Sequence, residues 1–203
     1  MPAAAASSAA ASEILTGLPI WAFADAEAWI EWLAAQDRAS PGVWLKLAKK
    51  GNPASRLTKP EAIDAALIHG WIDGQLNPYD DAWWLTRFTP RRPRSKWSEV
   101  NRTRATELIA DGRMAPGGLA EVAAAKADGR WAAAYAPAST AVVPDDLAAA
   151  LDANSKARAF FETLTGVSRY AVLYRMHDAK LPATRAARIA KFVALLGDGK
   201  TIG

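Results

Sequence analysis

Hydrophobic positions recur with two different periods along the first third of the chain. Apolar residues spaced three and four apart predict a helix over residues 25–36, and Asp25 stands where its side chain can cap the first turn. Over 43–48, Val, Leu and Leu alternate with Trp, Lys and Ala, which predicts a strand with one buried face. Thr58 and Glu61 have the spacing of a capping box, which predicts the start of a second helix.

Glycine and proline interrupt the segment that follows this helix. The two glycines that bound residues 70–74 predict a helix end and then a tight corner. Alternating aromatic residues predict a strand over 83–88, whereas the two prolines in 89–93 exclude a central strand there. Helical patterns then extend over 95–111 and 117–128.

The C-terminal part of the chain has only helical patterns. Residues 137–144 begin and end with proline and predict a linker, and the predicted helices beyond it are 145–153, 155–165, 168–178 and 183–196. The predicted fold class is α+β, with a small antiparallel sheet and packed helices over 13–136, followed by an all-helical C-terminal tail domain over 145–199. We expect residues 1–12, mostly alanine and serine, to be a disordered leader.

Composition narrows the function classes. The chain has 203 residues, of which 51% are hydrophobic and 23% charged, as in ordinary globular proteins. It has no cysteine, which excludes disulfides and thiolate metal sites, and only two histidines, so we expect neither a metal nor another cofactor. No apolar run is long enough to span a membrane and no secretory signal is evident, so we expect a cytoplasmic protein without membrane insertion.

Positive charge is concentrated in one short segment. Seven basic residues, six of them arginine, lie between Arg87 and Arg104 against one acid, Glu99, so this window carries +6 while the rest of the chain carries −2. Arginine forks bind carboxylates and phosphates, and the nearby Phe88 and Trp97 can stack on guanidinium groups. The segment is therefore either an anion-binding site or a solvated loop whose arginines pair with surface acids and tryptophans.

Asp73 is the candidate centre of a site. It lies among aromatic residues, where a carboxylate needs a cation or hydrogen-bond donors, so we expect a salt bridge to a nearby arginine at the mouth of a tryptophan-walled pocket. A purely structural Asp–Arg pair that holds the loop is the alternative. The arginines are Arg87, Arg91, Arg92 and Arg94, and the walls are Trp71, Trp83, Trp84 and Trp97. The candidate ligand-binding residues are Trp71, Asp73, Arg87, Arg91, Arg92, Arg94, Ser95, Trp97 and Asn101.

Three functions fit such a pocket. The first, which we favour, is a non-enzymatic binding protein for a small anionic or amphipathic ligand. The second is an enzyme in which Asp73 or His69 acts as acid or base while arginines hold an anionic substrate. The third is a nucleic-acid-associated factor, which only the arginines and aromatic residues support. For His69 the alternative is a core residue at a helix end. The sequence assigns neither the ligand nor an oligomeric state.

Two strings of residues carry a family resemblance. Residues 70–74, Gly-Trp-Ile-Asp-Gly, and residues 87–92, Arg-Phe-Thr-Pro-Arg-Arg, resemble the bacteriocin-protection, YdeI/OmpD-associated family. Shorter matches extend the resemblance from about Trp21 to Gly199. It implies a cytoplasmic bacterial protein linked to protection against bacteriocins or cationic peptides. The family often has a phenylalanine where this chain has His69, which argues against a general catalytic role for that histidine.

Overall fold

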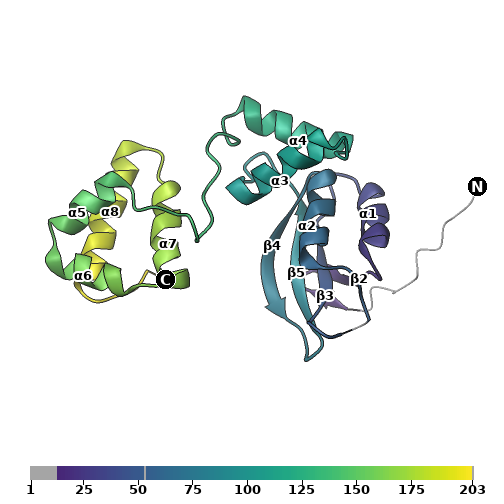
Figure 1. The fold of residues 1–203 in the computed structure, drawn as a ribbon, viewed down its shortest axis with the longest axis horizontal. Helices are drawn as coiled ribbons and strands as arrows, with labels where there is room; N and C mark the ends of the chain where they lie inside the picture. Colours follow the sequence, from purple (N-terminus) through teal and green to yellow (C-terminus); the bar gives the residue numbers. More distant parts are fainter. Residues whose placement is uncertain (1–12, 53, 203) are drawn as a thin grey trace, which may run out of the picture. The chain divides into compact units, whose positions relative to one another are not determined.

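The computed structural model describes residues 13–52 and 54–202, which divide into two compact units (Figure 1). The first unit comprises the chain up to Trp97 together with residues 101–133, and the second comprises residues 98–100 and the chain from Ala134 onward. The leader expected over residues 1–12 lies outside the described residues.

The first unit contains a sheet of mixed strand direction. Its strands are β1 (Ile14–Leu15), β2 (Leu18–Ala22), β3 (Val43–Ala48), β4 (Trp71–Pro78) and β5 (Trp83–Pro90), in the spatial order β1-β2-β3-β5-β4. The pair β2 and β3 is parallel, whereas the other neighbouring pairs are antiparallel. The α+β class is thus confirmed, but the sheet is not wholly antiparallel as expected. A helix lies between β2 and β3 in the chain, and such a crossover allows parallel pairing.

Helices cover one face of this sheet. The covering helices are α1 (Ala26–Ala34) and α2 (Lys59–Ile68) (Figure 1). Two further helices, α3 (Glu99–Ala110) and α4 (Pro116–Ala127), follow β5 in the chain. Asp25 caps α1 by accepting a 3.1 Å hydrogen bond from the Ala28 amide. Thr58 and Glu61 form the predicted capping box at the start of α2. Both helix starts were therefore predictable from the sequence.

The core of the first unit lies between α1, α2 and the sheet. Val43, Leu45 and Leu47, every second residue of β3, point into it, as the alternating pattern predicts. The expectation of a single buried face is wrong, however, because Trp44 on the opposite face is 2% exposed and packs with Leu18 and Leu85. Trp29 of α1 is completely buried, and its indole Nε1 donates a 3.1 Å hydrogen bond to the carbonyl oxygen of Ala62. This bond joins α1 to α2 and satisfies the single polar side-chain atom of a buried tryptophan.

The corner expected over residues 70–74 is instead the beginning of β4. From Trp71 onward the chain pairs with β5 in antiparallel register, and the register shifts between Asp73 and Leu76. The second glycine of the string therefore marks an irregularity inside a strand rather than a turn. The neighbouring strand β5 continues to Pro90, two residues past its expected end, because a proline at the last strand position removes no interior ladder bond.

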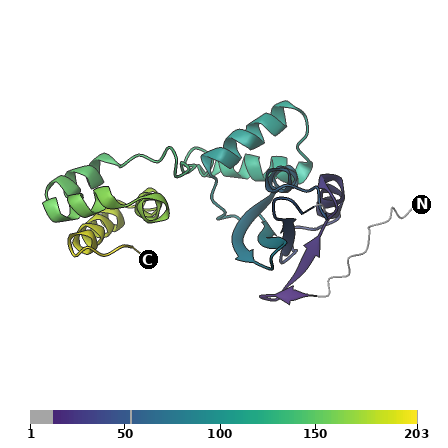
Figure 2. The same ribbon diagram turned by 60° about the horizontal axis from the view of Figure 1, so that its bottom comes forward.

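The second unit is a bundle of helices (Figures 1 and 2). They are α5 (Asp145–Asp152), α6 (Ser155–Thr163), α7 (Gly166–His177) and α8 (Pro182–Gly197). Their buried faces form a separate apolar core that includes Leu147, Phe161, Met176 and Phe192. The helical C-terminal region is thus confirmed. No helix in the described part of the chain is long and apolar enough to cross a membrane.

Helices α2 and α4 approach each other closely at Gly118. A Cβ atom on this residue would lie 2.3 Å from the carbonyl oxygen of Ile68 and 2.7 Å from that of Leu67. We expect Gly118→Ala to lower the free energy of unfolding by about 1–3 kcal/mol, although alanine is otherwise favoured over glycine inside a helix by roughly 1 kcal/mol. Urea unfolding measures the change, and an equally or more stable variant would contradict the close approach.

The segment 137–144 is predicted to be the first site of proteolysis. Val142 within it is 80% exposed, and the segment lies in the second unit just before α5. Exposed loop segments of this kind are where proteases cut first. We expect limited digestion with elastase to release two fragments that separate in this segment, as mass spectrometry of the products would show. Early cuts spread through α6, α7 and α8 would contradict a compact helical unit.

Candidate functional site

The fold divides the arginine-rich segment into buried and exposed side chains. Arg87 lies on β5 and is half-buried, Arg91 is buried, and Arg92 and Arg94 are exposed. A turn follows β5, closed by the Arg92 amide, which donates a 2.9 Å hydrogen bond to the hydroxyl oxygen of Ser95. The four arginines therefore do not form one continuous cluster.

Arg91 points into the protein. Its side chain is 2% exposed, and its guanidinium carbon lies 3.6 Å from the centroid of the Trp97 ring. The guanidinium Nη1 donates a 3.1 Å hydrogen bond to the carbonyl oxygen of Lys96, and the backbone amide donates one of 2.9 Å to that of Gly70. Arg91 is therefore part of the structure that supports the segment, stacked on the aromatic partner that the sequence suggested.

Asp73, Arg87 and Arg92 line one cavity of about 310 Å³ in the first unit. We name this cavity the sheet pocket; its other lining residues are Ile72, Gly74, Gln75 and Thr89. Arg87 comes from β5 and Asp73 from β4, and the Cα atom of Asp73 is paired with that of Phe88, next to Arg87. The lining of this cavity thus includes an acid and a base that are 14 positions apart in the sequence.

Asp73 takes part in none of the ion pairs formed among residues 13–52 and 54–202. The expected salt bridge to an arginine is therefore not formed, although two of the four named arginines line the same cavity. Asp73 is half-buried rather than enclosed, because β4 lies at the edge of the sheet. Water can therefore solvate the carboxylate, and the cost of leaving it without a cation is small.

The tryptophans expected as pocket walls lie elsewhere. Trp71 is buried in the core, where its ring lies 5.6 Å from that of Trp32, and Trp84 packs against the same core. Trp97 lies against Arg91, and neither it nor Trp83 lines the sheet pocket. The sheet pocket is consequently lined by polar residues together with Gly74 and Ile72, and by no aromatic ring of the described chain.

Three further residues named from the sequence also lie outside the sheet pocket. The carbonyl oxygen of Ser95 accepts a 2.9 Å hydrogen bond from Nη1 of Arg130, so this residue helps to hold the turn in place. Arg94 is exposed beside it, and Asn101 is half-buried on α3. The sheet pocket brings together Asp73, Arg87 and Arg92 from the predicted set, and adds Gln75 and Thr89 that the sequence did not single out.

His69 lies at the C-terminal end of α2, as its position in the helical pattern suggests. It lines a different cavity, of about 350 Å³, together with Trp71 and Arg38. Its Nε2 atom is buried without a hydrogen-bond partner, and burial lowers the pKa of the imidazole below its usual value.

Within residues 13–52 and 54–202, no acid side chain forms a hydrogen bond or ion pair with His69 that would orient it as a catalytic base. Asp64, the nearer aspartate before it in the sequence, accepts two hydrogen bonds from Arg104, Nε to Oδ1 at 2.7 Å and Nη2 to Oδ2 at 2.5 Å. Among the described residues, no group of three or more His, Asp or Glu side chains is arranged to hold a metal ion. The surroundings of His69 are those of a neutral imidazole at a helix end.

The lowered pKa of His69 predicts a pH dependence of stability. The unfolded chain binds a proton at His69 near pH 6.5, while the folded protein resists protonation to a lower pH. We therefore expect the free energy of unfolding to fall as the pH drops through about 6.5. The variant His69→Gln should lose part of this slope, as urea unfolding at several pH values would show. Equal slopes for both proteins would contradict a neutral buried imidazole.

Comparison with known families separates the two parts of the chain. Residues 21–121 match a family described as a domain of unknown function, and residues 140–199 match the family described as bacteriocin-protection, YdeI or OmpD-associated. No curated protein and no solved structure matches the chain. The strings at 70–74 and 87–92 thus lie in the part that matches the first family, whereas the named family covers the helical part. Over residues 140–199, the chain is thus similar to the bacteriocin-protection, YdeI or OmpD-associated family.

Proposed function

We propose that the first unit is a cytoplasmic, non-enzymatic binding module that holds a small anion in the sheet pocket. The environment of Arg87 is the observation that supports this proposal most directly. Its Nε atom is buried without a hydrogen-bond partner, in a side chain that lines the cavity. A buried donor without an acceptor costs about 1–3 kcal/mol, and more when the group is charged. An anion bound in the cavity would give this guanidinium group an acceptor.

The charges around the sheet pocket favour an anion over a cation. Arg87 and Arg92 contribute two positive charges and Asp73 one negative charge. Neither arginine forms an ion pair within the described part of the chain. A guanidinium group that no carboxylate occupies keeps its planar fork available for a carboxylate or phosphate ligand. Because Asp73 reduces the net charge of the lining to +1, the pocket suits a monoanion better than a polyanion.

Uncharged groups complete the lining. The side-chain amide of Gln75 and the hydroxyl group of Thr89 can donate further hydrogen bonds to an anion, and Gly74 has no side chain to fill the space. The register shift between Asp73 and Leu76 takes Gly74 and Gln75 out of regular pairing with β5. Such irregularities are frequent beside binding sites, because they redirect side chains at a sheet edge.

The size of the sheet pocket supports a small molecule rather than a nucleic acid. Its volume of about 310 Å³ lies at the lower end of the range for small-ligand pockets, which is about 300–1,000 Å³. Single-stranded nucleic acid would need a basic groove with aromatic stacking surfaces, and Trp71 and Trp97 are buried. Binding of a small anion would then contribute to the protection against bacteriocins or cationic peptides that the family resemblance implies.

Removal of the Arg87 charge should weaken anion binding. We expect the full chain to bind inorganic phosphate or acetate saturably in an NMR titration, and Arg87→Gln to weaken that binding by about tenfold or more, since it removes a charge-assisted hydrogen bond. Asp73→Asn should strengthen phosphate binding, because it removes the carboxylate that repels the more negative ion.

Arg94→Gln is the matched control for this experiment. It removes the same charge from an exposed neighbour that does not line the sheet pocket, and it should change affinity by less than a factor of about two at physiological salt. Equal losses in the two arginine variants would show diffuse attraction by a basic surface. A wild-type protein that binds neither ion would exclude the proposed site.

A further inference from the structure

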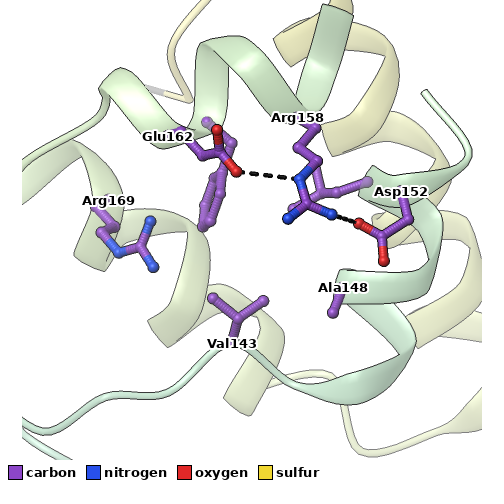
Figure 3. Close-up of a pocket in the computed structure, with 8 residues that line it drawn as sticks. Val143, Ala148, Asp152, Arg158, Glu162 and Arg169 are labelled. Atoms are coloured by element: carbon purple, nitrogen blue, oxygen red, sulfur yellow. Dashed lines mark hydrogen bonds and ion pairs between the residues drawn. The ribbon is translucent and has the colours of Figure 1, made fainter. Parts of the chain in front are cut away.

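The helical unit contains a second cavity, of about 270 Å³, between α5, α6 and α7. Figure 3 shows the side chains that line it. We name it the bundle pocket; its apolar residues are Val143, Ala148, Leu151 and Phe161, and its charged residues are Asp152, Arg158, Glu162 and Arg169. Apolar and charged groups are thus combined in one small cavity, which is the composition of a site for an amphipathic ligand.

The apolar residues form one rigid wall of the bundle pocket, which we call its floor. Leu151 and Phe161 are 4% and 3% exposed and belong to the core of the helical unit, so their positions are fixed by packing. Ala148, one helical turn before Leu151 along α5, and Val143, just before α5, complete this surface. A short apolar group placed here would contact an existing surface without rearranging the core.

Arg158 is held on one side of the bundle pocket by two carboxylates. Its Nε donates a 3.0 Å hydrogen bond to Glu162, and its Nη1 is bonded to Asp152 (Figure 3). The remaining terminal nitrogen, Nη2, has no hydrogen-bond partner among the described residues. The Arg158 side chain is 53% exposed, so these surface ion pairs orient the guanidinium group and leave one of its donor edges available.

Arg169 lies on the other side of the same cavity. It is half-buried, and its guanidinium carbon lies 4.5 Å from the centroid of the Phe161 ring. Within the described ranges it forms no ion pair. Stacking on a ring occupies one face of the guanidinium group and leaves its in-plane N–H donors available. Figure 3 shows the guanidinium groups of Arg169 and Arg158 on opposite sides of the space above Val143.

We propose that the bundle pocket binds a small amphipathic monocarboxylate, with its carboxylate group between Arg158 and Arg169 and its apolar chain on the floor. The charged lining sums to zero, because two arginines are balanced by Asp152 and Glu162. A dianion would be repelled by these two carboxylates, whereas a cationic head would compete with Arg169 for the face of Phe161. The site is separate from the sheet pocket, so each can be tested alone.

Affinity should follow the length of the apolar chain. We expect the bundle pocket of the full-length protein to bind acetate weakly and hexanoate more tightly, in NMR titrations that follow the signals of residues lining this pocket. Each added methylene group should strengthen binding by about fourfold until the cavity is filled. Hexylamine and hexanol, which have the same chain without the negative charge, should bind at least about tenfold more weakly than hexanoate.

Two variants test separately how the carboxylate group and the apolar chain of the ligand contribute to binding. Arg169→Gln removes the charge and should weaken hexanoate binding about tenfold or more, whereas the matched control Lys191→Gln, at an exposed site of the same unit, should not change it. Ala148→Leu fills the floor and should remove the gain from acetate to hexanoate while leaving all charges in place. Melting temperatures verify that the variants fold.

Three outcomes would overturn the proposal. Hexanoate that binds no more tightly than acetate would leave only surface ion pairing. Tighter binding of hexylamine would assign the pocket to a cation. Equal effects of Arg169→Gln and Lys191→Gln would show that the guanidinium group has no specific role. The sheet-pocket variant Arg87→Gln should leave hexanoate binding at the bundle pocket unchanged, so failure at one site is distinguishable from failure at the other.

Discussion

The burial of Arg91 against Trp97 determines how the arginine-rich segment is arranged. A guanidinium group that is 2% exposed is tolerated because Trp97 covers its face and the Lys96 carbonyl oxygen accepts from it. A buried charge that loses its partners typically costs about 3–5 kcal/mol, so this contact is expensive to break. With Arg91 fixed inward, the turn that follows leaves Arg92 and Arg94 exposed. One buried arginine thus sets the positions of its neighbours.

Strand alternation sets the position of Arg87. Phe88 is completely buried on the face of β5 that packs against α1 and α2, so the side chain before it lies on the opposite face. On that face Ile72 of β4 is paired with Thr89, and both line the sheet pocket. Asp73 is paired with Phe88 instead, and it lines the cavity at the point where the register shift interrupts the regular alternation of β4. The sheet pocket therefore arises from the packing of an apolar residue and from an irregular strand edge, and not from attraction between the charges.

Local signals made part of this structure predictable from the sequence. The cap at Asp25, the capping box at Thr58 and the periodicity of the tail helices depend on residues a few positions apart. Strand β4 was missed because its pairing with β5 is a nonlocal contact that overrides the turn signal of Gly74. For the same reason the charge pattern predicted that Asp73 lies near arginines, but it could not give the distance between the carboxylate and a guanidinium group. The sequence also did not show that Trp71 belongs to the core.

The two pockets each contain an arginine without an ion pair among the described residues, and they differ in the polarity of the other residues that line them. Each contains a half-buried arginine, Arg87 or Arg169, that forms no ion pair with a carboxylate of the described chain. Around Arg87 most of the described lining residues are polar and Ile72 is the single large apolar one among them, so charge and hydrogen bonding are the main means by which a ligand could be selected. Around Arg169 the floor is the apolar core of the bundle, so chain length adds a second criterion. An anion without an apolar part gains nothing from that floor, and this difference would allow one chain to distinguish two classes of small acid.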